Sequence, residues 1–131
     1  MPSVGPSVDV VDETFLAVPP PVVAAAFADP AAWRGYWPDL VLDVYADRGD
    51  AGLRWTVRGA LVGTMEVWLE PVLDGTLLHY FLRASPAAMP SPRPRPRDLR
   101  REVTRRQLAA KRVALELKVI LENGREPGCP P

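Results

Sequence analysis

The sequence has little of several residue types that usually carry covalent stability or metal chemistry. Its 131 residues include one cysteine, Cys129, and one histidine, His79. A lone cysteine has no partner for a disulfide within the chain, which is typical of a cytoplasmic protein. One cysteine and one histidine also cannot supply the four ligands of a structural zinc site. We therefore expect no disulfide, no metal and no cofactor.

Catalytic nucleophiles are also scarce. The four serines (Ser3, Ser7, Ser85, Ser91) lie in the N-terminal segment or around a proline-rich stretch, where no rigid element holds them. Both lysines, Lys111 and Lys118, fall in an expected C-terminal helix. The spacing from Gly59 to Gly63 matches neither a dinucleotide fingerprint nor a P-loop. We expect no covalent catalysis and no nucleotide binding, and the sequence assigns no catalytic residue.

Long hydrophobic runs are missing. The longest uncharged apolar stretch, residues 14–28, has 15 residues and contains three consecutive prolines, so it is too short to span a bilayer. The first residues show neither the basic region nor the apolar region of a secretory signal. We therefore expect a cytoplasmic protein without a membrane span.

The net charge of zero conceals two halves of opposite sign. Residues 1–84 hold 5 basic and 11 acidic residues, a charge of −6, whereas residues 85–131 hold 11 basic and 5 acidic residues, a charge of +6. Such asymmetry indicates either an interaction surface or a basic element folded onto an acidic one. Nucleic-acid binding is disfavoured, because no aromatic residues lie among the basic ones.

Hydrophobic patterning and turn residues predict a single domain over residues 1–131, with a core at about 8–124. A first strand over 8–18 ends at three prolines, and two short helices follow, over about 20–28 and 31–37. Four strands come next, separated by turn residues that include the hairpin signal Asp74-Gly75. Their expected ranges are 40–46, 52–58, 61–70 and 76–84. The order predicts an α+β protein with an antiparallel sheet of about five strands.

The C-terminal part reads as a connector, a helix and a tail. Residues 86–96 contain five prolines in eleven positions and predict an extended connector. A long helix is expected from about 97 to 123, where Asn123-Gly124 is a good stop signal, and residues 125–131 form a flexible tail. On a helical wheel the apolar residues that share one face and should cover the sheet are Leu99, Val103, Ala110, Val113, Ala114, Leu117, Ile120 and Leu121. A second apolar stripe, away from the sheet, contains Leu108, Leu115 and Val119.

Strand alternation divides the side chains between two faces. Leu53, Trp55 and Val57 share one face of their strand, and Met65, Val67 and Leu69 share one face of the next. The last strand is ambiguous, because Leu78, Tyr80 and Leu82 oppose another partly apolar row that contains His79 and Phe81.

This arrangement of elements resembles the START-like superfamily, and in particular its polyketide cyclase/dehydrase and lipid-transport-like proteins with the birch-pollen-allergen fold. The resemblance rests on FLAVPPPVVAAAFADPAAWRGYWPDL at residues 15–40, on VWLEPVLDGTLLHYFL at 67–82 and on the closing helix. It implies a helix-grip fold, in which the sheet wraps around the last helix. Only four strands follow the helical pair here, where many members have six, so we expect a shallow or open grip.

The resemblance implies binding of a small hydrophobic or amphipathic ligand between the sheet and the last helix. Superfamily cyclases assist aldol closure and dehydration of a polyketide, and the alternative is a non-enzymatic lipid carrier or a regulatory binding module. Arg106, near the centre of the helix's apolar face, would hold a ligand carboxylate or enolate, or else would pair with acidic residues of the sheet. The other candidate ligand-binding residues are Tyr80, Trp55, Met65, Trp37, Val103 and Ala110.

His79 is the only side chain whose ordinary pKa suits general base catalysis near neutrality. Alternation places it opposite Tyr80, so it points outward if Tyr80 points inward, and a catalytic role is disfavoured. Its neighbours Phe81 and Trp68 would form an apolar cluster that solvent disfavours. We therefore predict a homodimer contact through Trp68, His79 and Phe81.

Overall fold

The computed structural model describes residues 7–87 and 95–122, and its elements follow the predicted order. The strands are β1 (Val8–Leu16), β2 (Leu40–Asp47), β3 (Gly52–Gly59), β4 (Leu61–Val72) and β5 (Gly75–Pro86), and the helices are α1 (Pro20–Phe27), α2 (Pro30–Tyr36), the short 3-10 helix η1 (Gly49–Ala51) and α3 (Pro96–Glu122). The predicted α+β helix-grip arrangement is confirmed.

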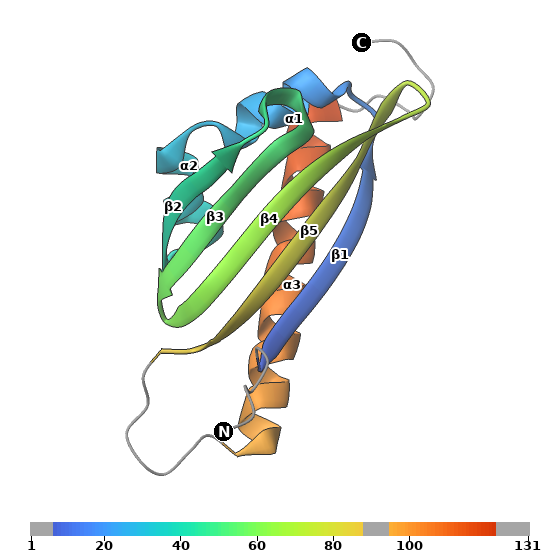
Figure 1. Cartoon of the computed structure of the whole chain (residues 1–131). Coiled ribbons are helices and arrows are strands. Elements are labelled where there is room, and N and C mark those ends of the chain that lie inside the picture. Colours follow the sequence, from blue (N-terminus) through green and yellow to red (C-terminus); the bar gives the residue numbers. More distant parts are fainter. Residues whose placement is uncertain (1–6, 88–94, 123–131) are drawn as a thin grey trace.

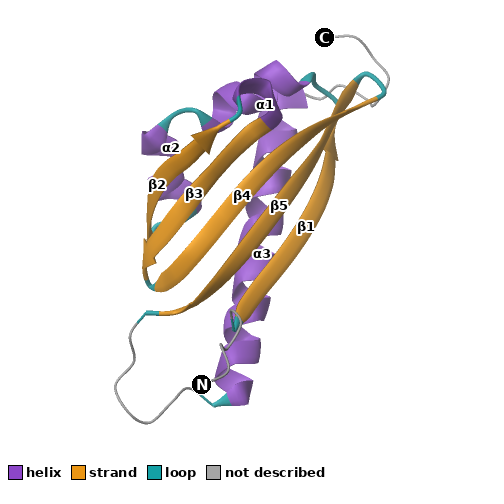
Figure 2. Cartoon of the chain, in the orientation of Figure 1, coloured by secondary structure: helices purple, strands orange, loops and turns teal. Residues whose placement is uncertain are grey.

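The five strands form one antiparallel sheet in the order β1-β5-β4-β3-β2, and α1, α2 and α3 all lie on one of its faces (Figure 2). The predicted hairpin lies between β4 and β5, where Val72 pairs with Gly75 and Leu73 takes a positive φ of 54°. A Cβ on Gly75 would lie 2.4 Å from the backbone oxygen of Leu16, so only glycine fits this close approach.

The core lies between the sheet and the helices, on the face that strand alternation predicted. Trp55, Met65 and Val67 are almost fully buried, which confirms the inward rows of β3 and β4. On β5 the ambiguity is resolved, because Leu78, Tyr80 and Leu82 join the core and His79 lies on the other face.

Local sequence explains the helical pair. Pro20 begins α1 with the φ angle that a first helical turn needs. Asp29 caps α2 by accepting a hydrogen bond from the backbone N–H of Ala31 at 2.9 Å. The indole Nε1–H of Trp33 donates to the backbone oxygen of Phe27 at 2.8 Å and so joins the two helices. Pro38, just after Trp37, directs the chain out toward β2.

Helix α3 runs along the inner face of the sheet (Figure 1). Its buried residues Ala110, Val113, Ala114 and Leu117 lie on the predicted apolar face. Ile120, which was predicted to join them, is 68% exposed, so that part of the prediction is wrong. The end of the helix is held from its other side, where Lys118 Nζ donates to the Phe15 oxygen and Glu122 accepts from the Ala17 N–H.

Part of the basic helix pairs with acidic and polar groups of the sheet edge. Lys111 Nζ lies 3.1 Å from a carboxylate oxygen of Asp12 and donates to Thr14 Oγ1 at 2.7 Å. This supports a basic helix packed on an acidic body. Among the described residues, the arginines near the helix start at positions 95, 97, 100 and 101 form no ion pair. The predicted connector is described only at its ends, and its middle, residues 88–94, lies outside the described residues, as does the predicted tail 125–131.

Candidate functional site

The space between the sheet and α3, where a ligand pocket was expected, is almost filled by side chains. Its void measures about 10 Å³, which is room for at most one water molecule. The residues that line this void are Asp12, Phe27, Trp37, Val67, Leu78, Tyr80, Ala110, Val113 and Ala114. In this conformation, side chains fill the space between the sheet and α3.

A larger depression lies just outside this void. It is a groove of about 520 Å³ between α3 and the segment that joins α2 to β2, a volume typical of small-molecule sites. Its lining residues are Tyr36, Trp37, Pro38, Asp39, Arg105, Arg106, Leu108, Ala109 and Arg112. Below, these nine residues are called the α2–α3 groove.

The Trp37 side chain separates the α2–α3 groove from the interior void, because it lines both. Its ring is 2% exposed and stacks on the Tyr80 ring, with centroids 6.1 Å apart and an angle of 14° between the planes. Trp55 meets the same indole edge-on at 5.8 Å. Trp37 is therefore the wall that closes the interior toward the groove.

Arg106, the most informative polar residue of the sequence, is fully engaged by carboxylates. It is 3% exposed, and its terminal nitrogens donate to the two carboxylate oxygens of Asp39 at 2.9 and 2.7 Å. Its Nε donates to Glu102 Oε2 at 3.0 Å. Of the two interpretations of Arg106, the acidic pairing therefore describes this conformation, although Asp39 precedes β2 and Glu102 lies on α3 itself.

Arg105 extends this network, because it donates to Asp39 at 3.1 Å and to Glu102 at 2.9 Å. Hydrogen bonds from Arg106 lower the pKa of Asp39, and those from Arg105 lower the pKa of Glu102. Both carboxylates therefore stay ionised at neutral pH and act as poor bases. The four side chains fix α3 to the segment before β2, and three of them, Asp39, Arg105 and Arg106, line the groove.

The remaining candidate residues lie behind Trp37. The Tyr80 hydroxyl donates to Met65 Sδ at 3.3 Å, and burial raises the pKa of this tyrosine, so it stays neutral. Trp55 is fully buried, between Trp37 and the ring of Trp33 at 5.4 Å. Ala110 lines the interior void. None of these four residues reaches the α2–α3 groove.

Val103 is half-buried against the core and does not line the groove. The sequence interpretation missed Arg105, Leu108, Ala109 and Arg112, because it followed the buried face of α3 and the groove is lined by the next residues around the helix. One signal was present: in Trp37-Pro38-Asp39 a proline ends the helix, and a carboxylate follows two residues after an aromatic residue.

His79 lies on the outer face of the sheet, as predicted, but it is only 6% exposed. Trp68 stacks on its ring at 4.3 Å, and Phe81 lies parallel to it at 6.3 Å. Its Nε2 lies 2.9 Å from Glu70 Oε1, and its Nδ1 lies 3.3 Å from Glu13 Oε1. The two carboxylates face different ring nitrogens, so His79 is held in a fixed orientation away from the α2–α3 groove.

No helix among the described residues is long and apolar enough to cross a membrane. Within residues 7–87 and 95–122, no cluster of three potential metal ligands is present.

This chain is similar to known proteins in structure but not in sequence. No family model and no curated protein matches this chain. Among solved structures, Ms6760 from Mycobacterium smegmatis has a TM-score of 0.64 at 12% identity, over 89% of this chain and 92% of that one. The Aha1 dimer from Colwellia psychrerythraea has a TM-score of 0.59 at 14% identity, over 91% and 99% of the two chains.

The di-domain ARO/CYC StfQ from the steffimycin biosynthetic pathway has a TM-score of 0.60 at 16% identity, and the match covers 85% of this chain and 49% of StfQ. Similarity at these identities reflects a shared architecture rather than a shared reaction. The chain therefore has the helix-grip fold that its resemblance to the START-like superfamily predicted.

Proposed function

We propose that this protein binds a small hydrophobic or amphipathic molecule in the α2–α3 groove. The observation that carries the proposal is the groove of about 520 Å³ beside an interior that holds only about 10 Å³ of free space. Tyr36, Leu108 and Ala109 offer the ligand apolar surface in front of the buried Trp37. Arg112 offers it a charge. Ligand sites of this kind combine an apolar wall with a few polar groups.

Arg112 is the cation best placed to meet an anionic group of the ligand. Arg105 and Arg106 are hydrogen-bonded to Asp39 and Glu102, whereas the one ion pair of Arg112 within the described residues is with Glu116 at 3.9 Å, and both side chains are more than half exposed. Such exposed pairs contribute little and are readily exchanged. An amphipathic carboxylate or sulfonate with a flat apolar body fits this arrangement.

Binding is favoured over turnover by the state of the polar groups. A cyclase or dehydrase reaction needs a group that exchanges protons near neutral pH. Asp39 and Glu102 have lowered pKa values beside arginines, and burial raises the pKa of Tyr36, which lines the groove. Among the described residues around the groove, these groups form no acid and base pair poised for aldol closure and dehydration.

The binding proposal can be tested with a fluorescent anionic amphipath, anilinonaphthalene sulfonate, and one groove-filling variant. Ala109→Trp places an indole in the α2–α3 groove without changing the core, so we expect the dissociation constant of the probe to rise at least tenfold, the equivalent of about 1.4 kcal/mol. Gln107→Trp is the matched control, because Gln107 is exposed on α3 outside the groove. Equal loss of binding in both variants, or in neither, would contradict the proposal.

A second candidate is a carrier or regulatory module that acts as a homodimer through Trp68, His79 and Phe81. The outer face of the sheet favours it, because Trp68 is 37% and the adjacent Val11 is 56% exposed beside Phe81. His79 is buried beneath them and would support the contact rather than make it. We expect a dimer in light scattering at tens of micromolar and a monomer after Trp68→Arg. A wild-type monomer at that concentration would exclude this candidate.

A further inference from the structure

The outward face of α3 carries a row of exposed apolar side chains that the fold does not cover. Leu108, Leu115, Val119 and Ile120 are 67%, 48%, 75% and 68% exposed. Together with Lys111, Arg112 and Glu116 they line a shallow depression of about 670 Å³. Three of the four, at 108, 115 and 119, are the second apolar stripe that the sequence predicted. A contiguous apolar surface of this kind indicates an interaction site.

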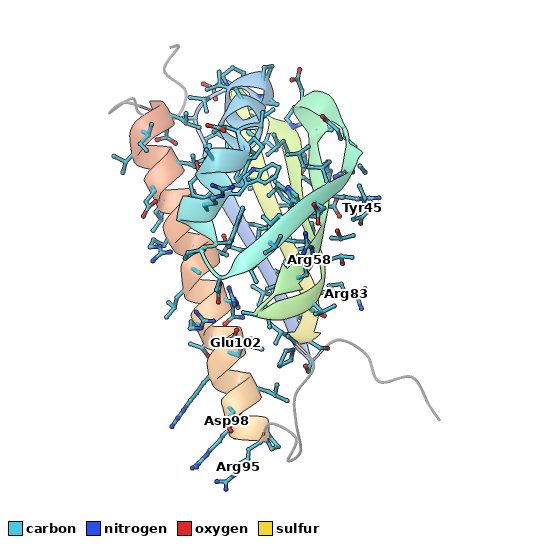
Figure 3. All side chains as sticks on the ribbon, turned by 90° about the vertical axis from the view of Figure 1, so that its left-hand side faces the viewer. Tyr45, Arg58, Arg83, Arg95, Asp98 and Glu102 are labelled. Atoms are coloured by element: carbon cyan, nitrogen blue, oxygen red, sulfur yellow. The ribbon has the colours of Figure 1, made fainter. Side chains whose placement is uncertain are left out.

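Arginines continue the same face toward the start of the helix. With about 100° of rotation per residue, Arg97 and Arg101 lie in line with Leu108 and Val119. The start of α3 extends past the ends of the strands (Figure 1), and Figure 3 shows Arg95 and Asp98 at this free end. Within the described residues, Arg95, Arg97, Arg100 and Arg101 are exposed and form no ion pair.

Two of these arginines, Arg95 and Arg97, lie at the very start of α3, where the helix dipole disfavours a cation. The N-terminal end of a helix carries a partial positive charge, and cations there are destabilising. No neighbouring carboxylate except Asp98 offsets this in the first turn. An external anion bound beside these two arginines would offset this cost.

The distribution of charge over the molecule also favours an anionic partner for α3. Helix α3 holds eight basic and four acidic residues, a net charge of +4, whereas residues 1–84 carry −6. In an anionic field the molecule would turn its α3 side toward the source. A second copy docked through its own α3 would bring like charge against like charge. Nucleic acid would match the arginines but would offer no apolar environment for Leu115 and Val119.

We propose that the outward face of α3 binds the surface of an anionic lipid bilayer, with the apolar row at the boundary of headgroups and acyl chains and the arginines on lipid phosphates. Helices with one apolar and one cationic part bind membrane interfaces in this way. Leu108 and Arg112 line both this face and the α2–α3 groove, so the groove opens beside the bound surface. The membrane contact itself does not depend on what the groove binds.

The test is co-sedimentation of the full chain with vesicles of phosphatidylcholine and phosphatidylserine in a ratio of about three to one. We expect binding that falls as salt is added and is absent on pure phosphatidylcholine. Each basic residue near such a surface contributes roughly fivefold in the partition coefficient, so Arg97→Gln with Arg101→Gln should lower it roughly 25-fold. Val119→Gln should lower it roughly fivefold.

Matched controls lie on the opposite face of the sheet. Arg58→Gln with Arg83→Gln removes two exposed arginines there, and Val62→Gln changes a 53% exposed valine of β4. We expect neither control to change vesicle binding, and the Arg97/Arg101 variant to keep the affinity for anilinonaphthalene sulfonate, which separates this proposal from the groove. Absence of wild-type binding would overturn it. So would α3 variants that alter only the oligomeric state or only the binding of a short DNA duplex.

Discussion

Replacing Trp37 with alanine is expected to lower the free energy of unfolding by about 3–5 kcal/mol, the range for removal of a buried aromatic side chain. Trp37 is 2% exposed and contacts the rings of Phe27, Tyr36, Trp55 and Tyr80. The same change removes the wall between the α2–α3 groove and the interior. Because apolar cavities of this kind take up small apolar molecules, we also expect the variant to bind benzene or a similar small aromatic compound. Urea denaturation with and without benzene measures both effects.

Trp68→Ala is the matched control, because Trp68 is on the outer face and 37% exposed. It should cost less stability than Trp37→Ala and should create no site for benzene. If benzene stabilised both variants equally, or stabilised the wild type as strongly as Trp37→Ala, then Trp37 would not be the wall that closes the interior.

Replacing Arg106 with leucine is expected to cost about 2–3 kcal/mol at neutral pH. Removal of one member of a fully buried ion pair costs about 3–5 kcal/mol, because a charge is left without a partner. Here the cost is smaller, since the side chains of Asp39 and Glu102 are 35% and 21% exposed and Arg105 still bonds both. Arg58→Leu is the control, and its exposed pair with Asp43 should contribute less than about 1 kcal/mol.

The Arg106 variant should also change how stability depends on pH. The folded-state pKa values of Asp39 and Glu102 lie below their ordinary values of 3.8 and 4.5, so their stabilisation is complete above about pH 5. This stabilisation is lost as pH falls below those ordinary values, because the unfolded chain binds protons at a higher pH than the folded protein does. The wild type should therefore lose stability more steeply than Arg106→Leu between about pH 5 and pH 3. If the stability of the wild type and of Arg106→Leu fell in parallel with pH, the ion pairs of Arg106 would not be the cause of this pH dependence.

Much of the fold could be predicted because it depends on local patterns. Period-two alternation identified the inward rows of β3 and β4, including Trp55 and Met65, before any contact was known. Prolines and glycines marked most element ends within a few residues. These signals are properties of neighbouring residues, so one sequence is enough to read them.

The site depends on contacts between distant parts of the chain, and a single sequence does not encode them locally. The bond from Arg106 to Asp39 joins residues 67 positions apart, and only the folded structure shows that the carboxylate before β2 meets the helix. The prediction that Ile120 is buried was wrong for a related reason. A helical wheel assumes that the same face of the helix is covered along its whole length. At the end of α3, however, Lys118 and Glu122 contact β1 and the segment after it, and these contacts lie on the side away from Ile120.

The groove itself was also beyond sequence reasoning. The expected pocket and the observed groove share Trp37 and Arg106, but whether large side chains fill the interior depends on how they pack together. Tyr80, Trp55 and Ala110 were correctly expected to face the space between sheet and helix, and they fill it. The α2–α3 groove lies one layer farther out, on the other side of Trp37.

The four tryptophans allow a direct test that this groove is the ligand site. Each indole N–H gives one signal in a proton–nitrogen correlation spectrum, and single Trp→Phe variants assign them. We predict that titration with anilinonaphthalene sulfonate shifts the signal of Trp37, which lines the groove, and leaves that of Trp68, on the far face of the sheet, unchanged. A shift of Trp68 with no shift of Trp37 would contradict binding in the α2–α3 groove.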